Sequence, residues 1–332
     1  MFEALLLAAN IWTSNVPPTA AQGTYLQLDA PVGVDTWLSP DIWSIPIYSS
    51  SSSDPKRPLL YNPQAWSNVA AGRWQRAGNR PAIEQEILAG SLPAFPITGN
   101  VFSSISPYDW VLPTSFKKTP TTSTMFHVAN DALPAPGPDG HMAVMQPDKT
   151  VLETYGTIVL STGQIIALSY SVSDLHSLGD GYQNGQTASM IPSYLGVIDD
   201  SEITAGKIDH AMAITLPARF LTTQIAYPAF AYDRNALTQT PPYSGPLPMG
   251  ARLAIPAKLD LNDLHLRSPA GQAIAAAAQQ HGFIVVDRGG EGITLRIRHN
   301  AQQPADILHH WNADLQADLQ AIFSHVVVVA QP

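Results

Sequence analysis

The sequence predicts an all-β protein, specifically a β-sandwich of the jelly-roll type with two or three peripheral helices. Three observations favour this class. Charged residues make up only 13% of the 332 residues, about half the usual share, and a helical bundle needs more of them on its solvent faces. Proline and glycine are plentiful, with 29 and 22 residues. Several short segments after residue 120 show the alternation of half-buried strands.

The clearest alternation lies in residues 164–174. Ile166, Leu168, Tyr170 and Val172 fall on one face there, and small polar residues fall on the other. This period of two predicts a strand with one buried face. Strand patterns also predict strands at 123–128, 141–146, 151–159, 164–172, 210–216, 252–255, 283–287 and 293–298, and 326–329 is expected to be a closing buried strand.

Three segments carry helix signals. A short helix is expected over 81–90, since proline favours the first helical position and glycine a helix end. Ser268 and Pro269 supply an N-cap and a first residue for a second helix, which Gly282 would end. Asn312 or Asp314 can cap a third, whose Leu315, Leu319 and Ile322 form one apolar stripe.

Composition divides the chain near residue 120. Residues 1–120 are rich in proline and hold six of the seven tryptophans. We expect this part to be an irregular segment that wraps the core, because burying tryptophan offsets the entropy lost on ordering. Residues 121–332 carry the strand patterns and are expected to form the β-sandwich domain.

Charge and cysteine content narrow the class of protein. A net charge of −9, with 17 Lys and Arg spread thinly, argues against nucleic acid as a partner. The chain has no cysteine, which excludes disulfides and thiol nucleophiles. No run approaches the ~18 apolar residues of a transmembrane helix, so membrane insertion is not expected. No Lys or Arg precedes the apolar run 4–9, which predicts a mature or truncated start.

Several motifs resemble those of a group of uncharacterised bacterial secreted or surface proteins. They are Asp139-Gly140-His141-Met142, Gln146-Pro147-Asp148 with Glu153-Thr154-Tyr155, Ala205-Gly206-Lys207-Ile208-Asp209-His210-Ala211, Met249-Gly250-Ala251-Arg252-Leu253, and the stretch from Gly282-Phe283 to Asp287-Arg288-Gly289-Gly290. The resemblance covers roughly residues 120–300. It implies an extracytoplasmic protein with a role at a surface or on a polysaccharide, by association only.

No established catalytic motif is present, so the candidates are polar residues in or beside apolar strands: His141, Glu153, Asp174 and His210. Each also has a structural interpretation. His141 would cap a strand start, Glu153 would pair with an arginine on a solvent face, Asp174 would begin a turn, and His210 would be a satisfied core histidine.

The turn at Pro147-Asp148 decides how His141 and Glu153 lie. With a two-residue loop, Glu153 faces Met142 and His141 points to the other face of the sheet. With a three-residue loop and a bulge, positions that sum to 296 pair, and His141 and Glu153 share a face. The sequence fits both registers, and only the second suits a shared site.

The loop after Asp174 has the composition of a sugar-binding surface. Asp180, Tyr182, Gln183 and Asn184 combine carboxylate, amide and aromatic groups between flexible glycines. Trp43, Trp66, Trp74 and Trp110 are expected to be mainly packing residues, and Trp74 and Trp110 are the two assigned to a substrate cleft. No cofactor and no metal are predicted.

These observations predict an extracytoplasmic carbohydrate-active protein, foremost a polysaccharide-cleaving glycoside hydrolase. A hydrolase would use Glu153 with Asp174 or Asp180 as its two carboxylates. A lyase would use His141 or His210 as base, with Tyr182. The alternative is a non-catalytic glycan-binding adhesin, phage-tail or surface module. The expected partner is a polysaccharide or oligosaccharide, and the oligomeric state is left open.

Overall fold

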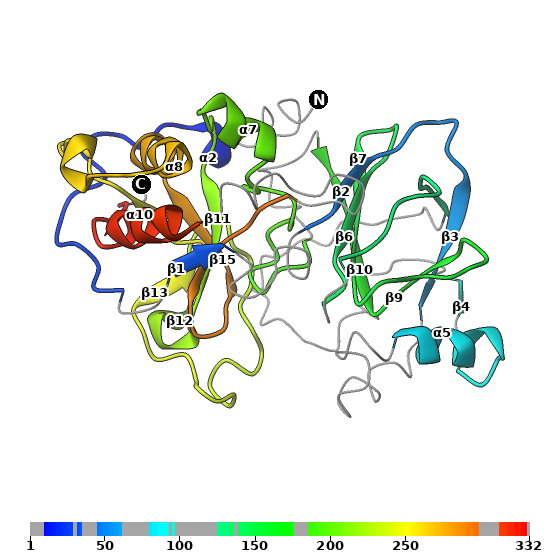
Figure 1. The fold of residues 1–332 in the computed structure, drawn as a ribbon. Coiled ribbons are helices and arrows are strands. Elements are labelled where there is room, and N and C mark those ends of the chain that lie inside the picture. Colours follow the sequence, from blue (N-terminus) through cyan, green and yellow to red (C-terminus); the bar gives the residue numbers. More distant parts are fainter. Residues whose placement is uncertain are drawn as a thin grey trace.

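The computed structural model describes residues 10–28, 32–34, 45–61, 80–92, 95–96, 125–135, 139–175, 185–298 and 312–330. Within these ranges the strands form two groups that lie side by side (Figure 1). One group is a six-stranded sheet flanked by helices, and the other is a pair of smaller sheets. None of the helices described is long and apolar enough to cross a membrane.

The pair of smaller sheets is the first group, and its two sheets pack face to face. One is ordered β10-β7-β6-β2, with β10 (Ser169–Asp174), β7 (Thr150–Tyr155), β6 (Met142–Met145) and β2 (Ile47–Ser49). The other is ordered β4-β3-β9-β8, with β4 (Phe95–Pro96), β3 (Lys56–Tyr61), β9 (Ile165–Ala167), β8 (Ile158–Val159), and β5 (Met125–His127) paired to β3.

Apolar side chains fill the space between these two sheets. Val144, Leu152 and Tyr170 from the first sheet and Leu59 and Ile165 from the second belong to one buried cluster. Helix α5 (Arg80–Leu88) packs on the outer face of the second sheet through a separate cluster. The opposite face of the first sheet is turned toward the other half of the molecule, and it carries the candidate site.

The hairpin of β6 and β7 adopts the three-residue register. Met145 pairs with Val151 and Ala143 pairs with Glu153, so paired positions sum to 296. Lys149 in the turn adopts the left-handed conformation, with φ 69°, and this allows the loop to hold three residues instead of two. His141 and Glu153 are therefore on the same face of the sheet, as the second of the two registers predicts.

The second group is a mixed sheet ordered β1-β16-β11-β15-β14-β17. Its strands are β1 (Val32–Val34), β16 (Ile293–Leu295), β11 (Met212–Leu216), β15 (Phe283–Arg288), β14 (Arg252–Ala254) and β17 (Val327–Val328). Strands β11 and β15 are parallel neighbours. The chain between them includes α8 (Pro269–Gln280), a helical crossover of the kind that parallel strands require.

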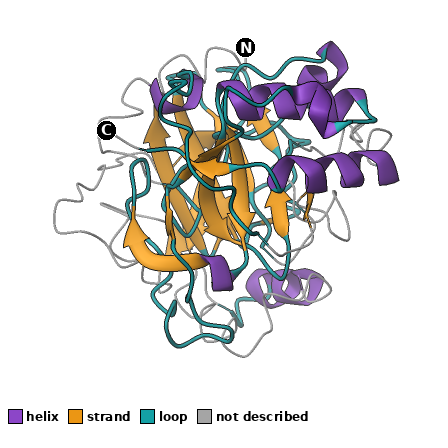
Figure 2. Ribbon diagram, turned by 90° about the vertical axis from the view of Figure 1, so that its left-hand side faces the viewer, coloured by secondary structure: helices purple, strands orange, loops and turns teal. Residues whose placement is uncertain are grey.

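Two helices of this group begin at the caps that the sequence predicts. The Ser268 hydroxyl accepts the N–H of Gly271 at 2.9 Å, with proline next to it, and the Asn312 side chain accepts the N–H of Leu315 at 3.0 Å. Helix α10 (Ala313–Phe323) packs on the sheet by stacking Phe323 on Phe283, with ring centroids 4.7 Å apart. Figure 2 shows the helices lying outside the strands.

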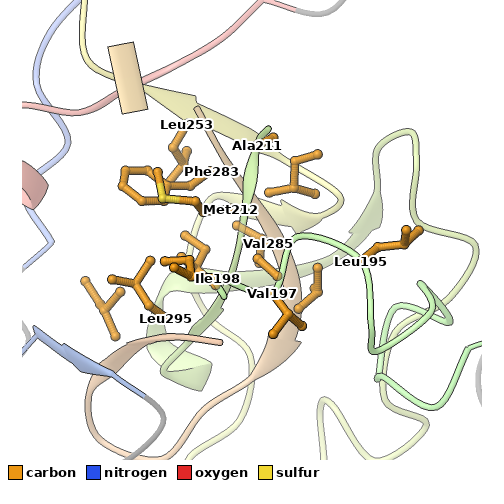
Figure 3. Packing of buried hydrophobic residues seen from close by; sticks show 14 of the residues in the cluster. Leu195, Val197, Ile198, Ala211, Met212, Leu253, Phe283, Val285 and Leu295 are labelled. Atoms are coloured by element: carbon orange, nitrogen blue, oxygen red, sulfur yellow. The ribbon is translucent and has the colours of Figure 1, made fainter. Parts of the chain in front are cut away.

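Shorter elements complete the chain. They are α2 (Asn10–Thr13), α7 (Asp200–Ala205), two 3₁₀ turns at Ala218–Phe220 and Leu261–Leu264, and the parallel pair β12 (Leu221–Ile225) and β13 (Leu247–Met249). The main core gathers around β11 and β15, and Figure 3 shows Met212, Phe283 and Val285 packed within it.

The prediction of an all-β jelly-roll sandwich is wrong. The sheets are mixed, several pairs of strands are parallel, and helices cover the six-stranded sheet. The alternation of apolar residues located strands, but it carries no information on strand direction or on the sheet to which a strand belongs. The run 164–174 divides between β9 and β10 in different sheets, with Ile166 and Leu168 in one buried cluster and Tyr170 in another. The low content of charged residues was also a poor argument against helices. Helix α8 is rich in alanine and mostly buried, so it needs few charged residues.

The early part of the chain contributes strands to both groups. Strand β1 pairs with β16, β2 pairs with β6, and β3 pairs with β9. Trp12 is fully buried in the main core, whereas Trp43, Trp66, Trp74 and Trp110 lie outside the described residues. The division into a wrapping segment, 1–120, and a domain, 121–332, stays a prediction.

Candidate functional site

Glu153 lies at the centre of the inward face of the sheet β10-β7-β6-β2. Its neighbours across the strands are Ala143 on β6 and Ser171 on β10. The side chain is 0% exposed, so the interpretation of Glu153 as a partner in a solvent-facing ion pair is wrong. A carboxyl buried this deeply needs hydrogen-bond donors.

Serine residues supply those donors. Glu153 Oε1 accepts the backbone N–H of Ser193 at 2.5 Å and also the Ser193 hydroxyl. Its Oε2 accepts the Ser171 hydroxyl at 3.3 Å. Burial raises the pKa of Glu153 from 4.5 to about 7, against the hydrogen bonds of Ser193 and Ser171 and the charge of Arg296, which act to lower it. Glu153 therefore exchanges its proton near neutral pH.

Three serines of β10 turn toward the same face. Because side chains alternate along a strand, Ser169, Ser171 and Ser173 line up there. Ser169 donates to the side-chain oxygen of Gln186 at 2.5 Å, and the hydroxyls of Ser173 and Tyr194 lie 2.8 Å apart. Residues 186–194, which we call the bridging segment, are thus attached to the sheet by a row of hydrogen bonds.

The bridging segment connects this sheet to the other half of the molecule. Its Ala188 N–H donates to Asp287 Oδ1 at 3.2 Å, and its Ser189 N–H donates to the Val286 carbonyl at 3.2 Å, both on β15. The Ser189 carbonyl accepts the N–H groups of Phe230 and Ala231 at 2.9 and 3.3 Å. The bridging segment is therefore hydrogen-bonded both to β15, which carries Asp287, and to the loop that carries Asp233.

Asp287 and Asp233 lie near enough at the carboxyl edge of the parallel strands for the charge of Asp287 to act on Asp233. Asp287 is the penultimate residue of β15, and β11 runs in the same direction beside it. In open α/β sheets, ligands bind at the edge where parallel strands end. Asp233 approaches from the loop that follows β12. The side chains of Asp287 and Asp233 are 20% and 28% exposed, so solvent reaches both.

The two acids differ in their partners. Asp287 accepts Arg296 Nη2 at 2.8 Å and the backbone N–H groups of Ala188 and Arg288. Asp233 accepts the hydroxyl of the buried Tyr243, and Arg288 Nε lies 3.9 Å from its Oδ2. These contacts give Asp287 the stronger stabilisation of an ionised carboxylate.

Burial raises the affinity of both acids for protons. Burial and then the charge of Asp287 raise the pKa of Asp233 from 3.8 to about 6. Burial also raises the pKa of Asp287, although Arg296 and the backbone N–H groups oppose it. Two carboxyls with perturbed pKa values at an accessible strand edge are typical of a catalytic site.

Arg296 joins the pair to Glu153. It is 5% exposed, binds Asp287 directly, and its charge acts on Glu153 as well. Arg296 thus interacts with Glu153 in the middle of the sheet β10-β7-β6-β2 and with Asp287 near the end of β15. Asp287 in turn acts on Asp233. The described residues contain no group of three or more acids and histidines that could hold a metal ion.

His141 shares the face of Glu153 but belongs to the neighbouring row of residues. Its ring packs edge-on against Tyr155, with centroids 5.3 Å apart, and it is 7% exposed. Its carbonyl accepts the N–H of Ala135, which fixes the start of the strand. The structure therefore places His141 and Glu153 on the same face of the sheet, in neighbouring rows.

His210 belongs to a different environment. Its Nε2 lies 3.0 Å from Glu202, and its Nδ1 lies 2.8 Å from the carbonyl of Ala211. Burial acts to lower the pKa of His210, but the hydrogen bond that its ring donates to Glu202 leads the effects that raise it overall. Since Glu202 also completes the capping box of α7, these contacts are those of a satisfied core histidine.

The remaining predicted residues are not positioned. Asp174 ends β10 opposite Thr150, but nothing is described of its side chain. The proposed substrate-binding residues lie outside the described ranges: Asp180, Tyr182, Gln183, Asn184, Trp74 and Trp110. The roles of these residues stay predictions.

Sequence reasoning missed Asp233, Asp287 and Arg296. A usable signal was present, because Asp287-Arg288-Gly289-Gly290 follows an apolar strand directly. Gly289 is needed for close packing, since a Cβ there would lie 2.6 Å from Thr215 Oγ1. An acid at that position becomes a site candidate only when the strand is known to be parallel to its neighbour.

The comparisons with known proteins add no assignment. The chain matches no protein family model, no curated protein and no solved structure. The argument about function therefore depends on the geometry of the site.

Proposed function

We propose that this protein is an extracytoplasmic carbohydrate-active enzyme, a polysaccharide-cleaving glycoside hydrolase that uses Asp233 and Asp287 as its two carboxyl groups. The observation that carries the proposal is the pairing of these acids at the carboxyl edge of β11 and β15. They are accessible to solvent, the charge of Asp287 raises the pKa of Asp233, and they have different partners. Glycosidases divide the work of acid and of base or nucleophile between two such groups.

Asp233 is the proton donor in this proposal. With a pKa near 6 it keeps its proton in mildly acidic solution, as a general acid must. The Tyr243 hydroxyl donates to Oδ2 of Asp233 and fixes the orientation of the carboxyl. Asp233 would give its proton to the glycosidic oxygen of the leaving sugar.

Asp287 is the ionised partner, because Arg296 and two backbone N–H groups stabilise its negative charge. It would act on the anomeric carbon directly as a nucleophile or activate a water molecule as a base. Asp287 must lose its proton before Asp233 does, which their unequal partners favour. The resemblance of several motifs to those of bacterial secreted proteins is consistent with a polysaccharide substrate and an extracytoplasmic location.

The test is a screen of the purified protein on diverse polysaccharides. Reducing ends report hydrolysis, and ultraviolet absorbance of an unsaturated product reports elimination by a lyase. We expect hydrolysis by the wild-type protein and a loss of at least about a thousandfold in kcat for Asp233→Asn and Asp287→Asn. Asp263→Asn, at an exposed position on another element, is the matched control and should keep full activity.

The other outcomes would reject the proposal. Unsaturated products would mean a lyase, for which His141 and Tyr155 are the groups to test next. Binding of a glycan without any product would mean a non-catalytic adhesin or surface module. Undiminished hydrolysis by both aspartate variants would move the active site elsewhere.

A further inference from the structure

We propose that Glu153 is a positioning residue that holds the Asp233–Asp287 pair in place through the bridging segment, an inference that rests on the catalytic role proposed for the pair. It differs from the expectation that Glu153 is itself a catalytic acid. The side chain is 0% exposed, so a substrate does not reach it.

The first step is the attachment of the bridging segment to the sheet. One oxygen of Glu153 takes both donors of Ser193, the backbone N–H and the hydroxyl. Its other oxygen takes the hydroxyl of Ser171 from the adjacent strand. The two Ser193 contacts fix the position and direction of the backbone at the far end of the segment.

The second step is the set of hydrogen bonds by which the bridging segment holds the surroundings of Asp287 and Asp233. Ala188, five residues before Ser193, donates its N–H to Asp287. Ser189 binds β15 through its N–H and the stretch just before Asp233 through its carbonyl. A shift of the segment would therefore displace the groups that orient both carboxyls.

The segment is compact enough to transmit that position. The Thr187 hydroxyl donates to the Ile191 carbonyl at 2.7 Å, and Met190 takes a left-handed conformation at φ 60°. Such a conformation in a fully buried methionine is strained and persists only when its surroundings hold it. A Cβ on Gly185 would lie 2.1 Å from the Ile191 carbonyl oxygen, so the segment closes tightly on itself.

One charged neighbour of Glu153 also contacts Asp287, and the other titratable neighbours lie on the same face of the sheet. Arg296 is attracted by Glu153 and bonded to Asp287. Tyr194 binds Ser173 on the same face, and His141 and Tyr155 occupy the next row across the sheet. Replacement of Glu153 by alanine or by glutamine removes the same charge from the surroundings of Arg296, so a difference between these two variants reports the route through Ala188.

The experiment compares Glu153→Ala, Glu153→Gln and Thr154→Val with the wild-type protein. Thr154 is the matched control, because it is buried and hydrogen-bonded on the same strand but faces the opposite side of the sheet. Hydrogen exchange of peptides covering 186–194 reports the anchoring. Carbon-13 titration of the aspartate carboxyls, with Asp287→Asn for assignment, reports the environment of Asp287 without any substrate.

For Glu153→Ala we expect exchange in 186–194 to rise at least about tenfold, since hydrogen bonds to an acidic group are lost. The pKa of Asp287 should be higher in Glu153→Ala than in Glu153→Gln because its bond from Ala188 weakens, and kcat should fall while KM is kept. Glu153→Gln should restore the exchange and kcat, because its amide oxygen can accept both Ser193 donors. If Glu153→Ala does not fold, Ser193→Ala should give smaller changes of the same sign.

Two results would overturn the inference. One is a response of Glu153→Ala no larger than that of Thr154→Val in exchange and in the Asp287 titration. The other is loss of activity in Glu153→Gln with unchanged exchange, which would make the proton of Glu153 catalytic. A wild-type protein that cleaves no glycan but shows the expected exchange and titration responses would support the positioning role and reject the proposed hydrolase.

Discussion

Replacing Glu153 by glutamine should make the protein more stable at high pH relative to the wild type. The folded state raises the pKa of Glu153 from 4.5 to about 7, so the folded protein binds this proton more tightly than the unfolded chain does. Stability that is present below the unfolded pKa is then lost as the pH rises through the folded pKa. At about 1.4 kcal/mol for each pKa unit, this ionisation costs about 3 kcal/mol.

Glutamine keeps the shape of the side chain but does not ionise. The free energy of unfolding of Glu153→Gln, minus that of the wild type, should therefore increase by about 3 kcal/mol between pH 4 and pH 8. Asp233 and Asp287 also have raised pKa values, but they titrate in both proteins and cancel in the difference.

Urea denaturation followed by tryptophan fluorescence at pH 4, 5, 6, 7 and 8 measures this difference. Thr154→Val is the control, because Thr154 is buried on the same strand and does not ionise, so its replacement should give a difference that does not vary with pH. A difference for Glu153→Gln that is equally flat across this range would refute the reasoning, since it would mean that Glu153 ionises normally in the folded protein.

Three further substitutions test the packing around the site by the midpoint and slope of urea unfolding. Phe323→Ala should lower the free energy of unfolding by about 3–5 kcal/mol, because the ring is buried and stacked on Phe283. Asp318→Asn should lower it by about 2–3 kcal/mol, because the buried carboxylate accepts two backbone N–H groups and a hydroxyl at the start of α8. Gly196→Ala should destabilise strongly, because φ is +68° and the new Cβ would lie 2.3 Å from Trp12; unchanged stability in any of the three would contradict the packing described.

Local elements were predictable from the sequence because they depend on neighbouring residues. Apolar strand patterns located the strands around Val151 and Phe283, and cap residues located the starts of α8 and α10. Strand direction depends on partners distant in the chain, so the parallel pairing of β11 with β15 was not predictable from alternation. The fold class was wrong for that reason.

The candidate site shows the same limit. Glu153 could be selected as an ionisable residue in an apolar strand, but its register depended on whether Lys149 adopts a left-handed conformation. Sequence patterns fit both turns. Asp233 and Asp287 are more than fifty residues apart in the chain, and only the folded structure brings their charges together.

The measurement that tests the central claim most directly is binding and turnover of one polysaccharide by the wild-type protein and by Asp287→Asn. Affinity electrophoresis gives the binding, and release of reducing ends gives the turnover. We predict that both proteins bind with similar affinity and that only the wild type cleaves. Cleavage by Asp287→Asn at the wild-type rate would contradict the claim, as would a wild-type protein that binds the polysaccharide and never cleaves it.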